Sequence, residues 1–481
     1  MKKNENIPLN YKEKNNAKIS LYVSVGVLAV LFIIFNQIDY QLIRKPAAQA
    51  QKAAAQEQKK KEEEEQAAAE VQVSTATVLA VGDNLVQPSL LQSGEYESGA
   101  WNYDHVYSGL QSMISAADVA IVNQETPFTT DHDAVSGSTP YATPTEIGDA
   151  LVAAGFDVVT SATDLMDDSG SDLVSQTLSY WQSSHPETLL AGLYSSKEEA
   201  AQIQTLEVNG IKIAFLDYTF PTLGSSDNSG STDEDSESTE DSSESTTSAA
   251  DTYVVNTFDT QAVAAAIQAA KNAADCVIFS ANWGKAEEPM PTEYEKQWAN
   301  FLMEQGVDVV IGTHPNVLQP YGYLSDDAGH NMLIYYSLGN FVSGAETLKQ
   351  LLGGMAGFTI QKTVTGDQVD IEITNASLTP LVMHYSYDNG EYQPYLLSDY
   401  TEELASQHSM QEVLGDEFSL ANLQTKYDEI MSMKVTPSTG STLLDASFDS
   451  EGNMYDSSGN YIEDTDSITS VDYYQNLSTD H

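Results

Sequence analysis

VDVVIGTHPNVLQPYGYLSDDAGHNMLIYYSLGNFVSG, residues 307–344, contains two apolar β-rich runs, Val307–Ile311 and Met332–Tyr336. The first run ends in the polar sequence GTHPN, and the second ends in SLGNF. Near-continuous apolar strands are typical of sheets that are covered on both faces by other layers. Because α/β proteins place their sites at the carboxyl ends of such strands, we expect a site at these two ends.

Earlier runs of the same kind end in polar residues as well. Strands are predicted at 76–81, 118–122, 156–160 and 276–279, followed by GDN, NQETP, SATDL and SANWG. Helices are predicted at 144–154, 171–183, 260–274 and 291–305, with Pro144 and Pro291 in the first turns of two of them. Asn209-Gly210 and Gly366-Asp367 predict two hairpins. The alternation predicts an α/β fold with parallel strands and a late antiparallel addition, in a mixed two-sheet core.

The strand ends carry the residues that a metal site would use. The candidates are carboxylates, amides and one imidazole: Asp83, Asn84, Glu125, Asp164, Asp168, Asn282, His314 and Asn316. Carboxylate and imidazole ligands can hold metal ions that activate water and clamp a phosphoryl group. Each residue alone also fits a structural role, such as Asp83 capping a turn or Glu125 bonding to a neighbouring loop. Their order along the chain is what indicates a site.

Six short motifs give the chain a resemblance to a known family. They are GD at 82–83, NQETP at 123–127, DSG at 168–170, WG at 283–284, GTHP at 312–315 and YSLGNF at 336–341. In this order they resemble the CapA family of poly-γ-glutamate capsule biosynthesis proteins, which are related to metallophosphatases. The resemblance covers about residues 75–343. It implies a membrane-anchored, outward-facing protein with a metallophosphatase-like α/β/β/α sandwich of mixed sheets, preceded by one transmembrane helix.

The chain departs from the family at three histidines. Leu165 stands where the family has the histidine of Ala-Asn-Asn-His, Asn282 replaces the histidine of His-Trp-Gly, and Asn316 replaces the second histidine of His-Pro-His. The arginine that usually follows Gly-Asp has no counterpart near Pro88. Leucine cannot bind a metal or transfer a proton, and asparagine cannot act as a general acid.

The residues that remain are mostly oxygen donors. They are Asp83, Glu125, Asp164 and Asp168, with His314 as the last histidine and the catalytic residue if any catalysis persists. Such a set suits a hard divalent ion, Mg²⁺, Mn²⁺ or Ca²⁺, better than a two-metal phosphatase centre. Three alternatives stay open: a site that has lost its chemistry and binds no metal, an altered oxygen-ligand site, and a working hydrolase.

The charge distribution excludes nucleic acid as a partner. The chain has a net charge of −51, and from Val71 onward it has 62 acidic residues, nine Lys and no Arg. Neutralising phosphates requires a basic face, which this part lacks. It should also repel other polyanions, so we expect binding of an anionic polymer to depend on divalent cations. The single cysteine, Cys276, excludes a disulfide framework.

The chain divides into six segments by composition. Residues 1–18 form a polar, Lys-rich tail, expected to be cytoplasmic, and the apolar stretch 19–38 is long enough for one membrane-spanning helix. A cleaved signal peptide and a core helix are the alternatives, but the small-residue triplet Ala48–Ala50 lies far beyond the apolar run. Residues 39–72 predict a charged helical stalk. Residues 73–435 are predicted to form the CapA-like domain, with an acidic insert at 223–252 that is predicted to be disordered, and an acidic tail predicted to be disordered occupies 436–481.

Two functions compete on these grounds. The first is an accessory protein in the biosynthesis or export of an anionic, poly-γ-glutamate-type capsule polymer, with a degenerate metal site and other capsule-synthesis membrane proteins as partners. The second is a metal-dependent hydrolase or transferase that acts on a phosphoester or a γ-glutamyl bond. A surface binding module is a third hypothesis, for which no specific residue argues.

Overall fold

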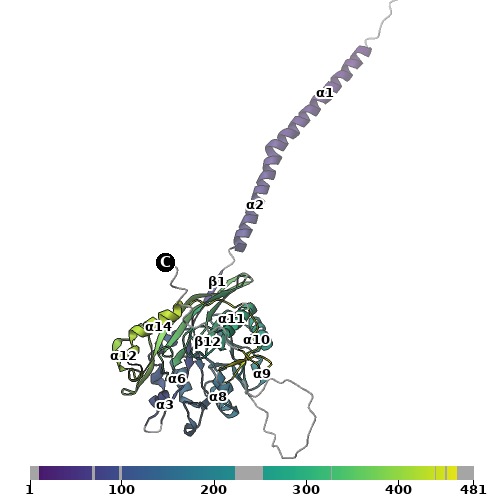
Figure 1. Cartoon of the computed structure of the whole chain (residues 1–481). Helices are drawn as coiled ribbons and strands as arrows, with labels where there is room; N and C mark the ends of the chain where they lie inside the picture. The colour runs from purple at the N-terminus through teal and green to yellow at the C-terminus, as the bar shows by residue number, and fades with distance from the viewer. Residues whose placement is uncertain are drawn as a thin grey trace, which may run out of the picture. The chain divides into compact units, whose positions relative to one another are not determined.

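The structure is a computed structural model that describes residues 10–67, 71–96, 100–222, 253–326, 328–438, 440–449 and 452–462. The acidic insert predicted at 223–252 lies outside the described residues, as do residues 463–481 of the predicted tail. The chain forms two compact units, Met1–Gln72 with Val364–Gln368, and Val73–Thr363 with Val369–His481. Figure 1 shows both units.

Most of the described part of the first unit is helical. Helix α1 spans Asn10–Asp39, a π-helical turn spans Tyr40–Arg44, and α2 spans Lys45–Ala67. The stretch Ser20–Leu42 has a mean hydropathy of 2.2 and none of it is buried. Among the described residues it is the one helix long and apolar enough to cross a membrane.

The larger unit contains an eight-stranded sheet, sheet one. Its order is β18-β17-β16-β1-β2-β5-β6, and β15 pairs with the end of β1. The pairs β1–β2, β2–β5, β5–β6 and β1–β15 are parallel, and β17–β18 is antiparallel. The strands span Gln72–Asn84 (β1), Val119–Gln124 (β2), Val158–Thr160 (β5), Leu189–Ala191 (β6), Asn340–Val342 (β15), Leu352–Thr365 (β16), Gln368–Ser386 (β17) and Glu391–Leu396 (β18).

A six-stranded sheet, sheet two, has the order β13-β14-β12-β11-β9-β8. Its four central strands are parallel and both edge strands are antiparallel. The strands span Gln204–Val208 (β8), Ile211–Thr219 (β9), Cys276–Asn282 (β11), Val309–Thr313 (β12), Tyr321–Ser325 (β13) and Asn331–Tyr335 (β14). The predicted hairpin at Asn209-Gly210 joins β8 to β9, with positive φ at both residues.

The two sheets pack face to face. Alternate residues of sheet two, including Phe215, Ile278 and Ile311, belong to the same core cluster as the residues of sheet one. The residues between them, including Phe279 and Val310, pack instead with helices α10 (Thr260–Ala273) and α11 (Glu293–Gln305). Strands β2 and β5 are buried on both faces, so sheet one is also covered on the side away from sheet two. The predicted mixed α/β sandwich is confirmed.

The remaining elements are short, apart from α8 and α14. Two predicted helix starts were wrong, because Thr145 and Thr292 precede the first helical residues and both prolines therefore lie outside the helices. The elements are α3 (Pro88–Gly94), α4 (Asp104–Tyr107), α5 (Gln111–Ile114), β3 (Phe128–Thr129), a 3-10 turn (His132–Ala134), β4 (Thr143–Pro144), α6 (Glu146–Ala154), α7 (Asp164–Asp167), α8 (Ser171–Ser184), β7 (Leu193–Tyr194), α9 (Lys197–Ala200), β10 (Val254–Val255), α12 (Glu402–Gln407), α13 (Gln411–Leu414), a 3-10 turn (Gly415–Glu417) and α14 (Leu420–Ser432).

The C-terminal segment corrects one prediction. Residues 436–462, predicted as part of a disordered tail, carry a small sheet of β19 (Ser447–Phe448), β20 (Met454–Tyr455) and β21 (Tyr461–Ile462). Phe448 is 6% exposed, and its ring centroid lies 4.9 Å from those of Phe220 and Tyr294. The segment is ordered because its few apolar side chains enter the core of the larger unit.

Candidate functional site

The predicted strand ends converge at one place. Asp83 lies near the end of β1, Glu125 directly follows β2, and Asp164 opens α7 after β5. Asn282 ends β11 and His314 directly follows β12. Sheet one therefore supplies three carboxylates, and sheet two supplies an amide and an imidazole. We call this cluster the strand-end site.

Three of its residues are spaced for a metal ion. Glu125, Asp164 and His314 each offer one ligand atom, and these atoms lie within 4.8 Å of one another. His314 Nδ1 lies 3.3 Å from Asp164 Oδ1. The side chains of His314 and Asp164 are 14% and 21% exposed, whereas Glu125 is 2% exposed. Solvent therefore reaches the group from the side of Asp164 and His314.

Asp83 is joined to this group by Asn123, to which the sequence analysis gave no role. Asn123 Nδ2 donates to Asp83 Oδ1 at 2.9 Å and to Glu125 Oε2 at 2.5 Å. Its Oδ1 accepts from Thr160 Oγ1 at 3.1 Å, which orients the amide. The backbone N–H of His314 also donates to Asp83 Oδ2, at 3.3 Å. An amide donor thus lies between the two most buried carboxylates.

Asn282 acts as a cross-link between the sheets. Its Oδ1 accepts from Thr219 Oγ1 at 2.8 Å and from the backbone N–H of Asp164 at 3.3 Å. Its Nδ2 lies 3.4 Å from both carboxylate oxygens of Glu125. Because both the oxygen and the nitrogen of the amide form hydrogen bonds within the protein, Asn282 helps to position Glu125 and Asp164.

The loop after β12 has an unusual backbone. His314 and Asn316 have φ values of 87° and 58°, which only a few per cent of non-glycine residues adopt. Asn316 Nδ2 donates to the carbonyl of His314 at 2.7 Å, and the Asn316 carbonyl accepts from Asn340 Nδ2 at 3.2 Å. The φ values thus belong to a loop held by side-chain hydrogen bonds, as is common at functional sites.

Two predicted positions lie apart from the ligand group. Asp168 is exposed, and its Oδ1 accepts from Thr222 Oγ1 at 3.0 Å. Thr222 also donates to Asp167 and bridges to Phe448. Leu165 follows Asp164 in α7 and offers no ligand atom. The structure therefore places Asp83, Glu125, Asp164 and His314 together and leaves Asp168 outside.

Burial shapes the electrostatics of the cluster. Burial raises the pKa of Asp83 to about 6 and raises the pKa of Glu125 well above its ordinary value, and neighbouring carboxylates add to both effects. Burial would also raise the pKa of Asp164, but the charge and hydrogen bond of His314 lower it overall. Burial would lower the pKa of His314, but Asp164 and Asp83 raise it. Three carboxyl groups share one imidazole as their basic partner, and the raised pKa values of Asp83 and Glu125 mean that their protonated forms are favoured over the charged ones.

A buried carboxylate in sheet two holds the loop that carries Asp164. Asp217 Oδ2 accepts from the backbone N–H groups of Ser161 and Ala162, both at 2.8 Å. Asp217 is fully buried, and its Oδ1 has no hydrogen-bond partner among the described residues. Asp217 lies inside a strand rather than at a strand end, so the sequence pattern did not identify it.

The donor set fits one hard cation better than a pair of transition metals. Two carboxylates and one imidazole at ligand spacing match the ligands of Mg²⁺, Mn²⁺ or Ca²⁺. The amide groups of Asn123 and Asn282 direct their N–H donors toward the carboxylates. An N–H donor cannot bind a metal ion, so these two residues do not provide the further ligands that a second metal would need.

A family model described as bacterial capsule synthesis protein PGA_cap matches residues 77–345, more than half of the chain. The chain is 25% identical over 282 residues to the PGA biosynthesis protein CapA of Bacillus subtilis (strain 168), covering 58% of this chain and 67% of that protein. It is 24% identical over 197 residues to the capsule biosynthesis protein CapA of Bacillus anthracis, covering 40% of this chain and 41% of that protein.

Two solved structures align with part of the chain at TM-scores below 0.5. A hypothetical protein from Thermus thermophilus aligns with a TM-score of 0.33 at 15% identity, over 63% of this chain and 99% of that one. A Staphylococcus aureus protein described as a 5′-nucleotidase aligns with a TM-score of 0.38 at 12% identity, over 66% of this chain and 57% of that one.

Proposed function

Since the chain belongs to the bacterial capsule synthesis protein PGA_cap family, we propose that it is an accessory protein in the biosynthesis or export of an anionic capsule polymer of the poly-γ-glutamate type. The match over residues 77–345 carries this proposal, because it contains all five strand ends of the site. Three of the histidines that the resemblance implies are replaced, which favours a role without two-metal phosphatase chemistry.

In this proposal the helix Ser20–Leu42 anchors the protein in the cell membrane, with the larger unit outside the cell. The apolar length of the helix and the absence of any buried residue in it support an anchor. The acidic, arginine-free composition from Val71 onward supports an exposed aqueous compartment. The partners would be other membrane proteins of capsule synthesis.

The strand-end site would hold one divalent ion on Glu125, Asp164 and His314. The excess of buried carboxylates over basic groups supports this, because uncompensated buried charge is costly and a cation relieves it. The ion would supply positive charge to an otherwise acidic surface. An anionic polymer could then bind through the cation, which like-charge repulsion would otherwise prevent.

A second candidate is a metal-dependent hydrolase or transferase that acts on a phosphoester or a γ-glutamyl bond. The position of His314 favours it, because the imidazole is partly exposed and paired with Asp164, as a proton donor would be. Glu125 and Asp164 would hold the ion, which would polarise the bond to be broken, and His314 would have to give up its place as ligand to move a proton.

Complementation tests the first proposal. The full-length chain would be expressed in a strain that lacks its gene, and the cell-associated polymer would be measured. We expect restoration by the wild type, and a loss of about tenfold with Glu125→Gln combined with Asp164→Asn. Asp168→Asn is the matched control, since Asp168 lies outside the ligand group, and it should restore polymer fully. Failure of the wild type to restore polymer would refute the capsule role.

Turnover assays separate the two candidates. The purified full-length protein would be tested with phosphodiester and γ-glutamyl substrates, with and without Mg²⁺ or Mn²⁺. The accessory role predicts no metal-dependent turnover. Metal-dependent turnover that disappears in Asp83→Ala would establish the enzyme instead. Metal analysis that finds no bound ion at millimolar Mg²⁺, Mn²⁺ or Ca²⁺ would rule out a cation at the strand-end site in both candidate functions.

A further inference from the structure

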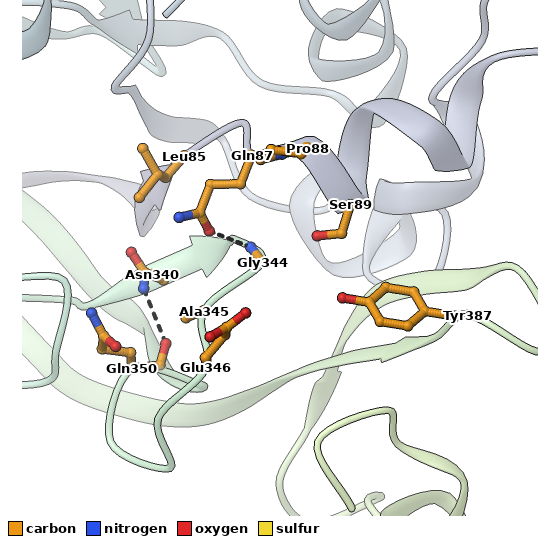
Figure 2. A pocket seen from close by; sticks show the side chains of 10 residues that line it. All are labelled: Leu85, Gln87, Pro88, Ser89, Asn340, Gly344, Ala345, Glu346, Gln350 and Tyr387. Atoms are coloured by element: carbon orange, nitrogen blue, oxygen red, sulfur yellow. Dashed lines mark hydrogen bonds between the residues drawn. The ribbon is translucent and has the colours of Figure 1, made fainter. Parts of the chain in front are cut away.

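A pocket of about 390 Å³ lies at the end of β1, beside β15 (Figure 2). Its polar lining comes from three stretches of the larger unit, 85–89, 340–350 and residue 387, and consists of Gln87, Ser89, Asn340, Glu346, Gln350 and Tyr387. The volume falls within the ~300–1,000 Å³ typical of small-molecule sites. None of these residues belongs to the strand-end site.

Asn340 connects this pocket to the strand-end site. It pairs in register with Asp83 across β1 and β15. Its Nδ2 donates to the carbonyl of Asn316 at 3.2 Å and to the carbonyl of Gln350 at 3.0 Å. Since both partners are carbonyls, the amide orientation is fixed. The pocket and the loop that carries His314 therefore share one wall.

The pocket carries a negative charge without a compensating one. Glu346 is the one charged side chain in the lining, and it is exposed. In the part of the chain that the structure describes, no ion pair includes Glu346. Figure 2 shows its carboxylate and the hydroxyl of Tyr387 pointing toward each other. A carboxylate in this setting repels anions and attracts cations.

One buried acceptor in the lining of this pocket, Asn340 Oδ1, has no donor among the described residues. Gln87 Oε1 accepts from the backbone N–H of Gly344 at 2.6 Å, and Ser89 Oγ lies 3.1 Å from Tyr392 Oη. Asn340, which is 1% exposed, has no hydrogen-bond partner at Oδ1 among the described residues. A buried acceptor without a donor carries an energetic cost that a ligand N–H would remove. The exposed ring of Tyr387 offers a face for a cation as well.

We propose that this pocket binds a small ligand through a protonated primary amine. Glu346 supplies the charge partner, and the neutral side chains of Gln87, Gln350 and Tyr387 bind the rest of the ligand. An amino sugar and the amino terminus of a peptide both present this group. The proposal does not depend on a metal in the strand-end site or on the capsule role.

Matched ligand pairs test the proposal by calorimetry on the full-length protein in detergent. Glucosamine is compared with N-acetylglucosamine, and alaninamide with N-acetylalaninamide, at about pH 6.5, where both free amines are protonated. We expect at least one free amine to bind about tenfold more tightly than its acetylated partner. The pair with the larger difference identifies the source of the amine.

Two variants locate the interaction. Glu346→Gln keeps the side-chain shape and should weaken amine binding about tenfold. Glu412→Gln, an exposed acid outside the pocket, should leave it unchanged. Glu125→Gln should abolish cation binding at the strand-end site but preserve amine binding, which separates this proposal from the previous one. Equal affinity for free and acetylated ligands, no binding of either, or unchanged amine binding in Glu346→Gln would overturn the proposal.

Discussion

At the residue scale, Asn282 shows how a position within a ligand cluster can be structural. Its amide accepts from Thr219 and from the backbone of Asp164, and it faces Glu125 with its donor. A neutral histidine ring has one nitrogen that donates and one that accepts. It could not accept both of the hydrogen bonds that the amide oxygen of Asn282 accepts. Asn282 thus links strands β9 and β11 of sheet two to Glu125 and to the loop that carries Asp164.

Asn282→Ala should therefore lower stability. The change removes the acceptor for the buried Thr219 Oγ1 and for the partly buried backbone N–H of Asp164. We expect the free energy of unfolding to fall by about 1–3 kcal/mol, measured by urea denaturation. Asn300→Ala, which removes one exposed hydrogen bond to Glu304, should change it by less than about 0.5 kcal/mol. Equal effects of the two variants would contradict the structural role.

Asp217 predicts a pH effect on stability. Burial raises its pKa from 3.8 to about 7, although the N–H groups of Ala162 and Ser161 oppose the shift. Between pH 3.8 and about 7 the unfolded chain loses this proton while the folded chain keeps it, so the stability contribution of Asp217 falls as pH rises. Asp217→Asn keeps an acceptor for both N–H groups and removes the titration. The free energy of unfolding of the wild type, relative to that of this variant, should fall by up to about 4 kcal/mol between these pH values. A difference that stays constant with pH would contradict a raised pKa for Asp217.

The sequence identified some of these residues and could not identify others. Asp83, Glu125 and His314 could be predicted because each stands where an apolar run stops. Asp217 could not, because it sits inside β9 and its partners are backbone groups 55 and 56 residues away. Asp168 was grouped with the ligands but lies outside them, since proximity in sequence to Asp164 does not fix the direction of a side chain on a short helix.

At the element scale, the C-terminal hairpins extend the core beyond the region of family similarity. Asp449 accepts from Asn453 at the first turn, and Asp456 accepts from Asn460 at the second. Each turn thus repeats the same D-x-x-G-N hydrogen-bond pattern. The order of this segment was not predictable from composition, because its apolar residues are few and widely spaced between turn residues. The helices α8, α10 and α11 were predictable because their apolar faces repeat with helical period, and Asp259 and Thr292 cap the starts of α10 and α11.

Phe448→Ala tests whether this segment stabilises the larger unit. The ring is 6% exposed and packs against Phe220, which in turn lies 4.7 Å from the ring of His314. Removing a buried phenyl ring should lower the free energy of unfolding by about 3–5 kcal/mol in chemical denaturation. Tyr461→Ala, at a residue 59% exposed in the same small sheet, should cost under about 1 kcal/mol. A small effect of Phe448→Ala would mean that the segment is not part of the core.

At the scale of the whole molecule, negative charge dominates. From Val71 onward, 62 acidic residues face nine lysines, so folding brings like charges together. Screening by any salt should relieve part of this repulsion. A cation held at a defined site should add a stabilisation that depends on its ligands.

Thermal unfolding can separate these two effects. At matched ionic strength, millimolar Mg²⁺ or Ca²⁺ should raise the Tm of the wild type more than NaCl does, by about 3 °C if the ion is near a hundredfold above its Kd. Glu125→Gln should retain the effect of NaCl and lose the extra shift, because it removes one ligand of the strand-end site. An equal extra shift in the variant would assign it to diffuse screening.

The division of the strand-end site between two sheets has a mechanical consequence. Asp83, Glu125 and Asp164 move with one layer, whereas Asn282 and His314 move with the other. A sliding of the layers by a fraction of an ångström would leave most of the interior intact and yet change every separation across the cluster. An ion bound at this site would connect ligands from both sheets and would therefore oppose a displacement of one sheet relative to the other.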